Sequence, residues 1–139
     1  MQSVDPMKAN LRRSLNGVRV LIVEDHEDSR IVFEQCLLLE GATVLTAPSA
    51  RQALALLAEH DVDIVLTDYG MPGETGVWLL ARVREHSTTI PVVVVTGYHE
   101  ADVRHLRHAS FARVLRKPVG ADELCHELIA VLAESDTRS

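Results

Sequence analysis

The stretch "DIVLTDYGMPGETGVWLLARVREH", residues 63–86, decides the fold class. Residues 63–67 form a short apolar run, which is typical of a strand covered on both faces of a sheet. Asp68 follows directly, and then comes a loop that contains Pro72 and several glycines. Residues 76–86 carry apolar side chains at helical spacing and predict a helix. The stretch therefore predicts a strand, a loop and a helix, with one carboxylate where the strand ends.

The rest of the chain repeats this unit. We expect strands at 18–23, 42–47, 63–67, 90–96 and 112–116, and helices at 28–41, 50–60, 76–86, 100–109 and 121–134. Gly41 predicts the end of the first helix, and the pair Ser49 and Gln52 predicts a capped start of the second. Strands joined by helical crossovers form a parallel sheet with helices on both sides. We therefore predict an α/β fold, a doubly wound five-stranded parallel sheet flanked by five helices.

Length and composition limit the class of protein. The chain has 139 residues, 47% of them apolar, and a net charge of −6, which predicts one globular domain and argues against a nucleic-acid surface. Cys36 and Cys125, far apart in sequence, suggest buried thiols in a reducing compartment. We expect no signal peptide and no membrane span, and hence a cytoplasmic location. We expect residues 1–16 to be a flexible leader or tag, 17–134 the domain and 135–139 a tail.

Polar side chains follow four of the five expected strands. In chain order these are Glu24 and Asp25, then Asp68, then Thr96 and Gly97, and last Lys117 and Pro118. Ligands of open parallel sheets bind at the carboxyl ends of the strands. We therefore expect these groups to converge at one edge of the sheet and to form the functional site.

Three carboxylates at one edge repel one another, and a hard divalent cation relieves the repulsion. The sequence therefore predicts Mg²⁺ (or Mn²⁺) on Glu24, Asp25 and Asp68, with a main-chain oxygen near Gly70 as a further ligand. Lys117 adds a positive charge and a nearby threonine adds a hydroxyl donor. Such a set suits phosphoryl transfer, with Asp68 as the nucleophile.

The motifs "LIVEDH" (21–26), "LTDYGMPGETG" (66–76), "VVVVTG" (92–97) and "LRKP" (115–118) together resemble the receiver domains of bacterial two-component response regulators. The resemblance covers about residues 17–134 and implies a flavodoxin-like fold with strand order 2-1-3-4-5. It implies that a histidine kinase phosphorylates Asp68. It also implies roles for seven other residues. Metal ligands would be Glu24, Asp25 and the main-chain oxygen of Gly70. Contacts to the phosphoryl group would come from Thr96, Gly97 and Lys117, and the peptide bond before Pro118 would be cis.

The chain departs from the family pattern at two positions. Val114 stands at the switch position, where the family usually carries Tyr or Phe. Gly70 has no side chain where the family usually has one that shapes access to the phosphoryl group, so we expect water and small phosphodonors to reach Asp68 readily.

The resemblance also implies partners. These are a histidine kinase or phosphotransfer protein and an unknown downstream protein, with no nucleic acid and no membrane. Phosphorylation is expected to change the face formed by residues 100–109, 112–116 and 121–134, through which a homodimer could form. The segment "LRRSLNGVRVLIVEDH" resembles receivers that follow the kinase modules of hybrid histidine kinases. On this basis the chain is a regulatory phosphoacceptor, not an enzyme.

Other functions fit less well. A degenerate receiver that acts only as a protein-interaction module would lack an acid, Thr96 or Lys117, and here all are present. An aspartyl-phosphate hydrolase needs a second acid two residues after its nucleophile, where this chain has Gly70. A flavin or nucleotide binder needs a phosphate-cradling loop after the first strand, and "EDHEDS" is acidic. We expect His26 to be a solvated neighbour of the acidic pair.

Overall fold

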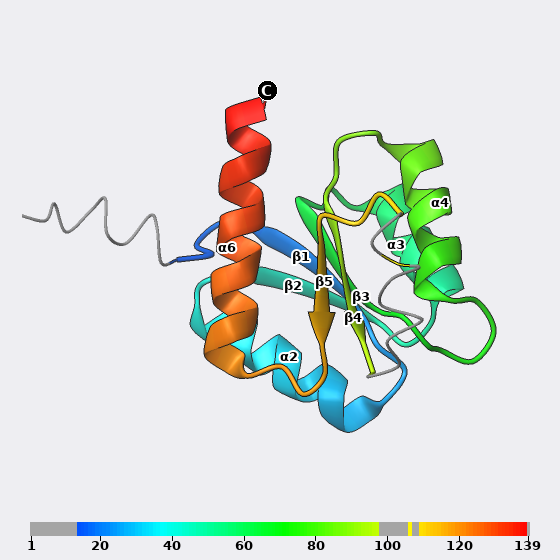
Figure 1. Ribbon diagram of the computed structural model, residues 1–139, viewed down its shortest axis with the longest axis horizontal. Coiled ribbons are helices and arrows are strands. Elements are labelled where there is room, and N and C mark those ends of the chain that lie inside the picture. The colour runs from blue at the N-terminus through cyan, green and yellow to red at the C-terminus, as the bar shows by residue number, and fades with distance from the viewer. Residues whose placement is uncertain (1–13, 98–105, 107–108, 139) are drawn as a thin grey trace, which may run out of the picture.

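The computed structural model describes residues 14–97, 106 and 109–138 (Figure 1). The strands are β1 (Arg19–Val23), β2 (Thr43–Ala47), β3 (Ile64–Asp68), β4 (Val92–Thr96) and β5 (Arg113–Arg116). The helices are α2 (Glu27–Leu39), α3 (Ala50–Glu59), α4 (Gly76–His86) and α6 (Ala121–Arg138). The predicted alternation of strands and helices is confirmed for this part of the chain. The helix expected at 100–109 lies almost wholly outside the described residues.

The five strands form one parallel sheet in the order β2-β1-β3-β4-β5. The predicted fold class and strand order are therefore confirmed. Every residue of β3 and β4 is buried, as expected for central strands covered on both faces. Val23 of β1 lies beside Thr67, and Asp68 lies beside Val95 of β4. This register brings the carboxyl ends of the three central strands to the same level.

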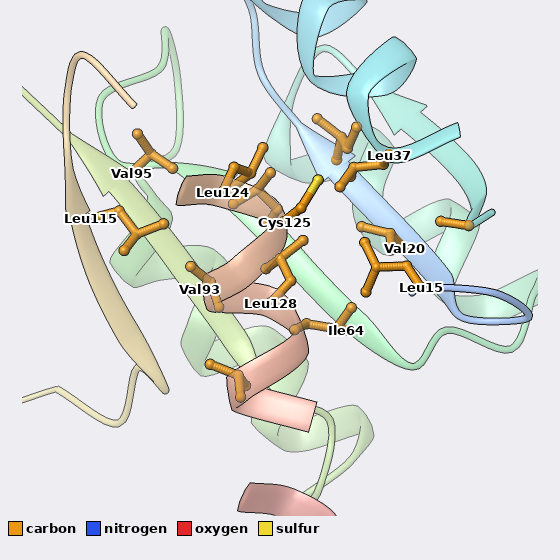
Figure 2. Packing of buried hydrophobic residues seen from close by; sticks show 14 residues of the cluster. Leu15, Val20, Leu37, Ile64, Val93, Val95, Leu115, Leu124, Cys125 and Leu128 are labelled. Carbon is orange, nitrogen blue, oxygen red and sulfur yellow. The ribbon is translucent and has the colours of Figure 1, made fainter. Parts of the chain in front are cut away.

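The helices form two layers, with α2 and α6 over one face of the sheet and α3 and α4 over the other (Figure 1). Each layer has its own apolar cluster, because side chains alternate between the two faces of a strand. Figure 2 shows Leu124, Cys125 and Leu128 of α6 packed over the sheet beside Leu37 of α2. Burial of each such leucine side chain stabilises the fold by about 1.5–3 kcal/mol.

Local sequence signals set the helix ends. Ser49 and Thr75 cap α3 and α4, because each side chain accepts a hydrogen bond from a backbone N–H, that of Gln52 and of Trp78 respectively. Helix α2 ends at Leu39, two residues before the expected position. Gly41, at φ +94°, completes a Schellman motif in which its N–H donates to Leu38 O and that of Ala42 to Leu37 O.

The described structure extends beyond both expected ends of the domain. Leu15, which we placed in the leader, is fully buried in the cluster under α2 and α6. Its N–H donates to Glu40 O at 3.0 Å. At the other end α6 continues through Arg138, past the expected limit of 134. The remaining shifts of element bounds are one or two residues, such as β4, which begins after Pro91.

The two cysteines are free thiols that serve packing. Cys125 is buried, Cys36 is half-buried, and the sulfur of Cys125 lies 3.9 Å from Cys36 O. Burial raises the pKa of the Cys125 thiol to about 11. The thiol therefore stays protonated near neutral pH and is a poor nucleophile.

The surface of α2 carries unusually exposed apolar side chains. These are Ile31, Val32, Leu38 and Leu39, the last of which is 87% exposed.

Among the described residues, no helix combines the length and the apolar character that crossing a membrane requires.

Candidate functional site

The described residues include four buried polar or charged side chains, and all lie where strands end. They are Glu24, Thr67, Asp68 and Thr96. Glu24 directly follows β1, the next two end β3, and Thr96 ends β4. Burial of a carboxylate is unfavourable unless it is paired or coordinated. Two buried acids at one sheet edge therefore indicate a functional site, and not a feature selected for stability.

Glu24 is held by the first turn of α2. Its side chain is 1% exposed, and Oε2 accepts a hydrogen bond from the backbone N–H of His26 at 3.1 Å. Arg30 fixes the backbone here, since its Nη1 donates to Glu24 O at 2.9 Å. Burial raises the pKa of the Glu24 carboxyl, and the charge of Asp68 raises it further. The His26 and Lys117 contacts only partly oppose this rise.

Asp68 is positioned by the loop that follows it. The hydroxyl of Thr67 donates to Asp68 O at 2.9 Å. Tyr69 ties the loop to both neighbours, because its N–H donates to Val95 O at 2.9 Å and its carbonyl accepts from Gly76 N–H at 2.8 Å. A Cβ on Gly76 would lie 2.9 Å from Asp68 O. The glycine therefore permits the close approach of α4 to the end of β3.

Lys117 supplies the positive charge of the site. Its Nζ lies 3.1 Å from Asp68 Oδ1 and 3.8 Å from Glu24 Oε1. Its backbone N–H donates to Thr96 O at 2.8 Å, which joins the ends of β4 and β5. The bond between Lys117 and Pro118 is cis. The ammonium thus contacts the acid that ends β3, the central strand.

The acidic side chains are arranged to accept a cation. Ligand atoms of Glu24, Asp25, His26 and Asp68 all lie within 4.8 Å of one another. Glu24 Oε1 and Asp25 Oδ1 are buried, and neither has a hydrogen-bond partner among the described residues. Gly70 is exposed, and the space around it is open. Oxygen donors of this number and type fit Mg²⁺, which retains several waters when it binds proteins.

The other predicted residues lie at different distances from this edge. Gly97 is exposed next to Thr96, and Val114 is half-buried on β5 beside Val94. Tyr98, an aromatic residue near the site in sequence, lies outside the described residues. Phe111, the other, packs in the cluster on the α3 and α4 face.

Two neighbours of the acids have roles that the sequence did not reveal. Arg30 anchors the Glu24 backbone, and no sequence signal distinguishes it from the other arginines of the chain. His26 lies at the N-cap of α2, with Nδ1 3.3 Å from Glu24 Oε2 and 3.6 Å from Asp25 Oδ1. The only signal for His26 was its place directly after the acidic pair.

Known proteins are similar to this chain in sequence and in fold. Residues 20–129 match the model of the response regulator receiver domain family. The chain is 35% identical over 115 residues to an uncharacterized 14.6 kDa protein of Leptolyngbya boryana, an alignment that covers 81% of this chain and 88% of that protein. It is 37% identical over 108 residues to the regulatory protein AtoC of Escherichia coli. That alignment covers 76% of this chain but only 23% of AtoC.

Solved structures agree with the sequence matches. A CheY-like response regulator receiver domain protein from Methanospirillum hungatei superimposes with a TM-score of 0.82 at 25% identity, covering 89% of this chain and all of that one. NtrX from Brucella abortus superimposes with a TM-score of 0.81 at 26% identity, over 88% of this chain and 28% of NtrX.

The fold and the acidic edge define a receiver module of two-component signalling. This chain belongs to the response regulator receiver domain family. It spans about a quarter or less of some curated relatives, 23% of AtoC and 17% of the sensory/regulatory protein RpfC of Xanthomonas campestris.

Proposed function

We propose that the chain is a phosphoacceptor in two-component or phosphorelay signalling, and that Asp68 takes the phosphoryl group. The observation that carries this proposal is the Lys117 ammonium 3.1 Å from Asp68 Oδ1, beside the buried Glu24. An ammonium so placed neutralises charge on oxygen atoms of a transferring phosphoryl group. The donor is a phosphohistidine of a histidine kinase or of a phosphotransfer protein, consistent with the match to the response regulator receiver domain family.

In the proposed step, a carboxylate oxygen of Asp68 attacks phosphorus. The new P–O bond forms as the P–N bond to the donor histidine breaks, and the leaving imidazole nitrogen takes a proton from solvent. Lys117 pairs with the phosphoryl oxygens, and the hydroxyl of Thr96 and the open backbone at Gly97 contact the same group. This chain positions the reacting atoms and is not itself an enzyme that turns over a substrate.

The residues that would hold Mg²⁺ (or Mn²⁺) are Glu24, Asp25 and Asp68, with the main-chain oxygen of Gly70. When bound, the cation would neutralise negative charge on the carboxylate and phosphoryl oxygens. The buried oxygens Glu24 Oε1 and Asp25 Oδ1, which have no hydrogen-bond partner among the described residues, support this assignment.

The proposed output is a change in the face that includes β5 and α6. The hydrogen bond from Lys117 N–H to Thr96 O couples the ends of β4 and β5. Because residue 114 is valine, a switch that depends on an aromatic side chain at this position cannot operate. Homodimerisation through this face, a downstream protein partner and a cytoplasmic location belong to the same proposal. Sedimentation with and without fluoroberyllate and Mg²⁺ tests the dimer.

Incubation with acetyl phosphate and Mg²⁺, followed by phosphate-affinity gels and intact-mass spectrometry, tests the phosphoacceptor. We expect a gain of one phosphoryl group in the wild type and none in Asp68→Asn. Asp61→Asn is the matched control, because Asp61 is 90% exposed and precedes β3 at the opposite edge of the sheet. Equal labelling of wild type and Asp68→Asn contradicts the proposal.

A further inference from the structure

His26 occupies a helix position that its side chain does not serve. It is the N-cap of α2, where a short polar side chain normally accepts a hydrogen bond from the first turn. The imidazole makes no such bond. Instead Nδ1 forms a hydrogen bond with Glu24 Oε2 at 3.3 Å and lies 3.6 Å from Asp25 Oδ1, on the side of the acids.

The spacing of these atoms suits ligands of one ion. Neighbouring ligands of an octahedral ion, each about 2.1 Å from the metal, lie about 3 Å apart. The two distances from His26 Nδ1 are close to this value. The ligand atoms of the four-residue set all lie within 4.8 Å of one another, so one ion can contact all of them.

The need for a cation is independent of the histidine. Glu24 is 1% exposed, and its Oε1 has no hydrogen-bond partner among the described residues. This oxygen faces the site, because it lies 3.8 Å from the Lys117 ammonium, which in turn contacts Asp68. A nearly fully buried carboxylate oxygen with no hydrogen bond and only this distant ion pair points to a further positively charged ligand.

We propose that His26 Nδ1 is a ligand of the cation at this site, and that it strengthens the binding of borderline divalent ions such as Zn²⁺ or Co²⁺ more than the binding of Mg²⁺. Imidazole nitrogen binds these ions well, whereas Mg²⁺ binds almost wholly through oxygen. The inference rests on the proposed function only in placing the cation on Glu24, Asp25 and Asp68. It adds a nitrogen ligand that the acids alone do not supply.

Calorimetric titrations of the full chain with Zn²⁺ and with Mg²⁺ test the inference. The test variant is His26→Asn, because asparagine is a good N-cap residue and lacks the imidazole nitrogen. We expect a Zn²⁺ affinity at least tenfold weaker in His26→Asn and a Mg²⁺ affinity changed less than threefold. The matched control is His60→Ala, since His60 is exposed after α3. It should leave both affinities unchanged.

Nitrogen NMR of the histidine rings gives a readout independent of affinity. In the wild type, Zn²⁺ should shift the Nδ1 resonance of the one ring whose signals disappear in His26→Asn, and Mg²⁺ should not. Unchanged Zn²⁺ affinity in His26→Asn, or equal losses for both ions, overturns the inference. So does a Zn²⁺-induced shift confined to other histidines.

The labelling of the wild type with acetyl phosphate separates this inference from the proposed function. If Asp68 is labelled but the wild type and His26→Asn bind Zn²⁺ equally, His26 is not a metal ligand, and the proposal that Asp68 is the phosphoacceptor is retained. If Asp68 is not labelled but His26→Asn loses the Zn²⁺ site selectively, the assignment of His26 stands and the phosphoacceptor fails.

Discussion

Lys117 Nζ lies 3.1 Å from Oδ1 of Asp68, so the cation that follows β5 contacts the carboxylate that ends β3. β4 separates the two strands in the sheet. The side chain therefore reaches across the end of β4, where Thr96 O holds its backbone N–H. The ammonium is a counter-charge for the buried acids Glu24 and Asp68.

Replacement of Lys117 by Met should separate cation binding from phosphorylation. Without the ammonium, the acids keep more negative charge, and a charge at this range contributes about 1–4 kcal/mol. We expect Mg²⁺ affinity to rise at least threefold and the rate of labelling by acetyl phosphate to fall at least tenfold. Calorimetry and phosphate-affinity gels measure the two quantities. Lys117→Arg should keep Mg²⁺ affinity near the wild-type value, and weaker Mg²⁺ binding in Lys117→Met would contradict the ammonium's role.

Gly76 and Gly70 should respond differently to alanine. A Cβ on Gly76 would meet Asp68 O at 2.9 Å and Tyr69 Cα at 3.2 Å, both backbone atoms. We expect Gly76→Ala to lower the free energy of unfolding by about 1–3 kcal/mol, although alanine favours helices, and to slow labelling of Asp68. Gly70 has open space where a Cβ would lie, so Gly70→Ala should be tolerated. Urea unfolding measures the free energy of unfolding of both variants. Equal free energies for Gly76→Ala and Gly70→Ala would argue against a close approach of α4 to the end of β3.

Leu37 and Leu39 form a matched pair on α2. Leu37 is fully buried, whereas Leu39 is 87% exposed. Leu37→Ala should cost about 2–5 kcal/mol of unfolding free energy, because it removes apolar contact and leaves a cavity. Leu39→Ala should change stability by less than about 0.5 kcal/mol. Thermal and urea unfolding measure the stability of the two variants against the wild type. A large loss in Leu39→Ala would mean that an interface between copies covers this residue.

Asp63 should make stability depend on acid pH. Burial acts to raise the pKa of its carboxyl, but hydrogen bonds from the Arg19 side chain and N–H outweigh burial and hold that pKa below its ordinary value of 3.8. A carboxyl with a depressed pKa stabilises the folded state above the unfolded pKa, and this contribution disappears as the pH falls through the folded pKa.

The measurement is the Tm of wild type and Asp63→Asn between pH 7 and pH 2.5. We expect the variant to melt about 2 °C lower at pH 7, and the difference to shrink below about pH 3.8. Asp61→Asn removes the other acid near Arg19, which lies 3.5 Å away but is 90% exposed, so it should change the Tm little at any pH. A difference that grows toward low pH would show that the sign of the linkage is wrong.

The sequence anticipated the fold closely, because its signals are local. The buried runs of β3 and β4 contain no polar residue before Thr67 and Thr96, and the caps of α3 and α4 depend on side chains within three residues of the bonds they make. Errors occurred where distant parts of the chain pack together. Leu15 falls in the segment that we expected to be a flexible leader, yet it is buried against residues that come later in the chain.

The order of polar residues along the chain by itself determined which side chains can meet. In a parallel sheet all strands end at the same edge, so Glu24, Asp68, Thr96 and Lys117 had to gather there. Only the tertiary structure decided the contacts among them. The register of β3 on β4 and the first turn of α2 set the 3.1 Å contact of Lys117 and the placement of His26 beside the acids. These depend on distances between separate elements, which local sequence preferences do not specify.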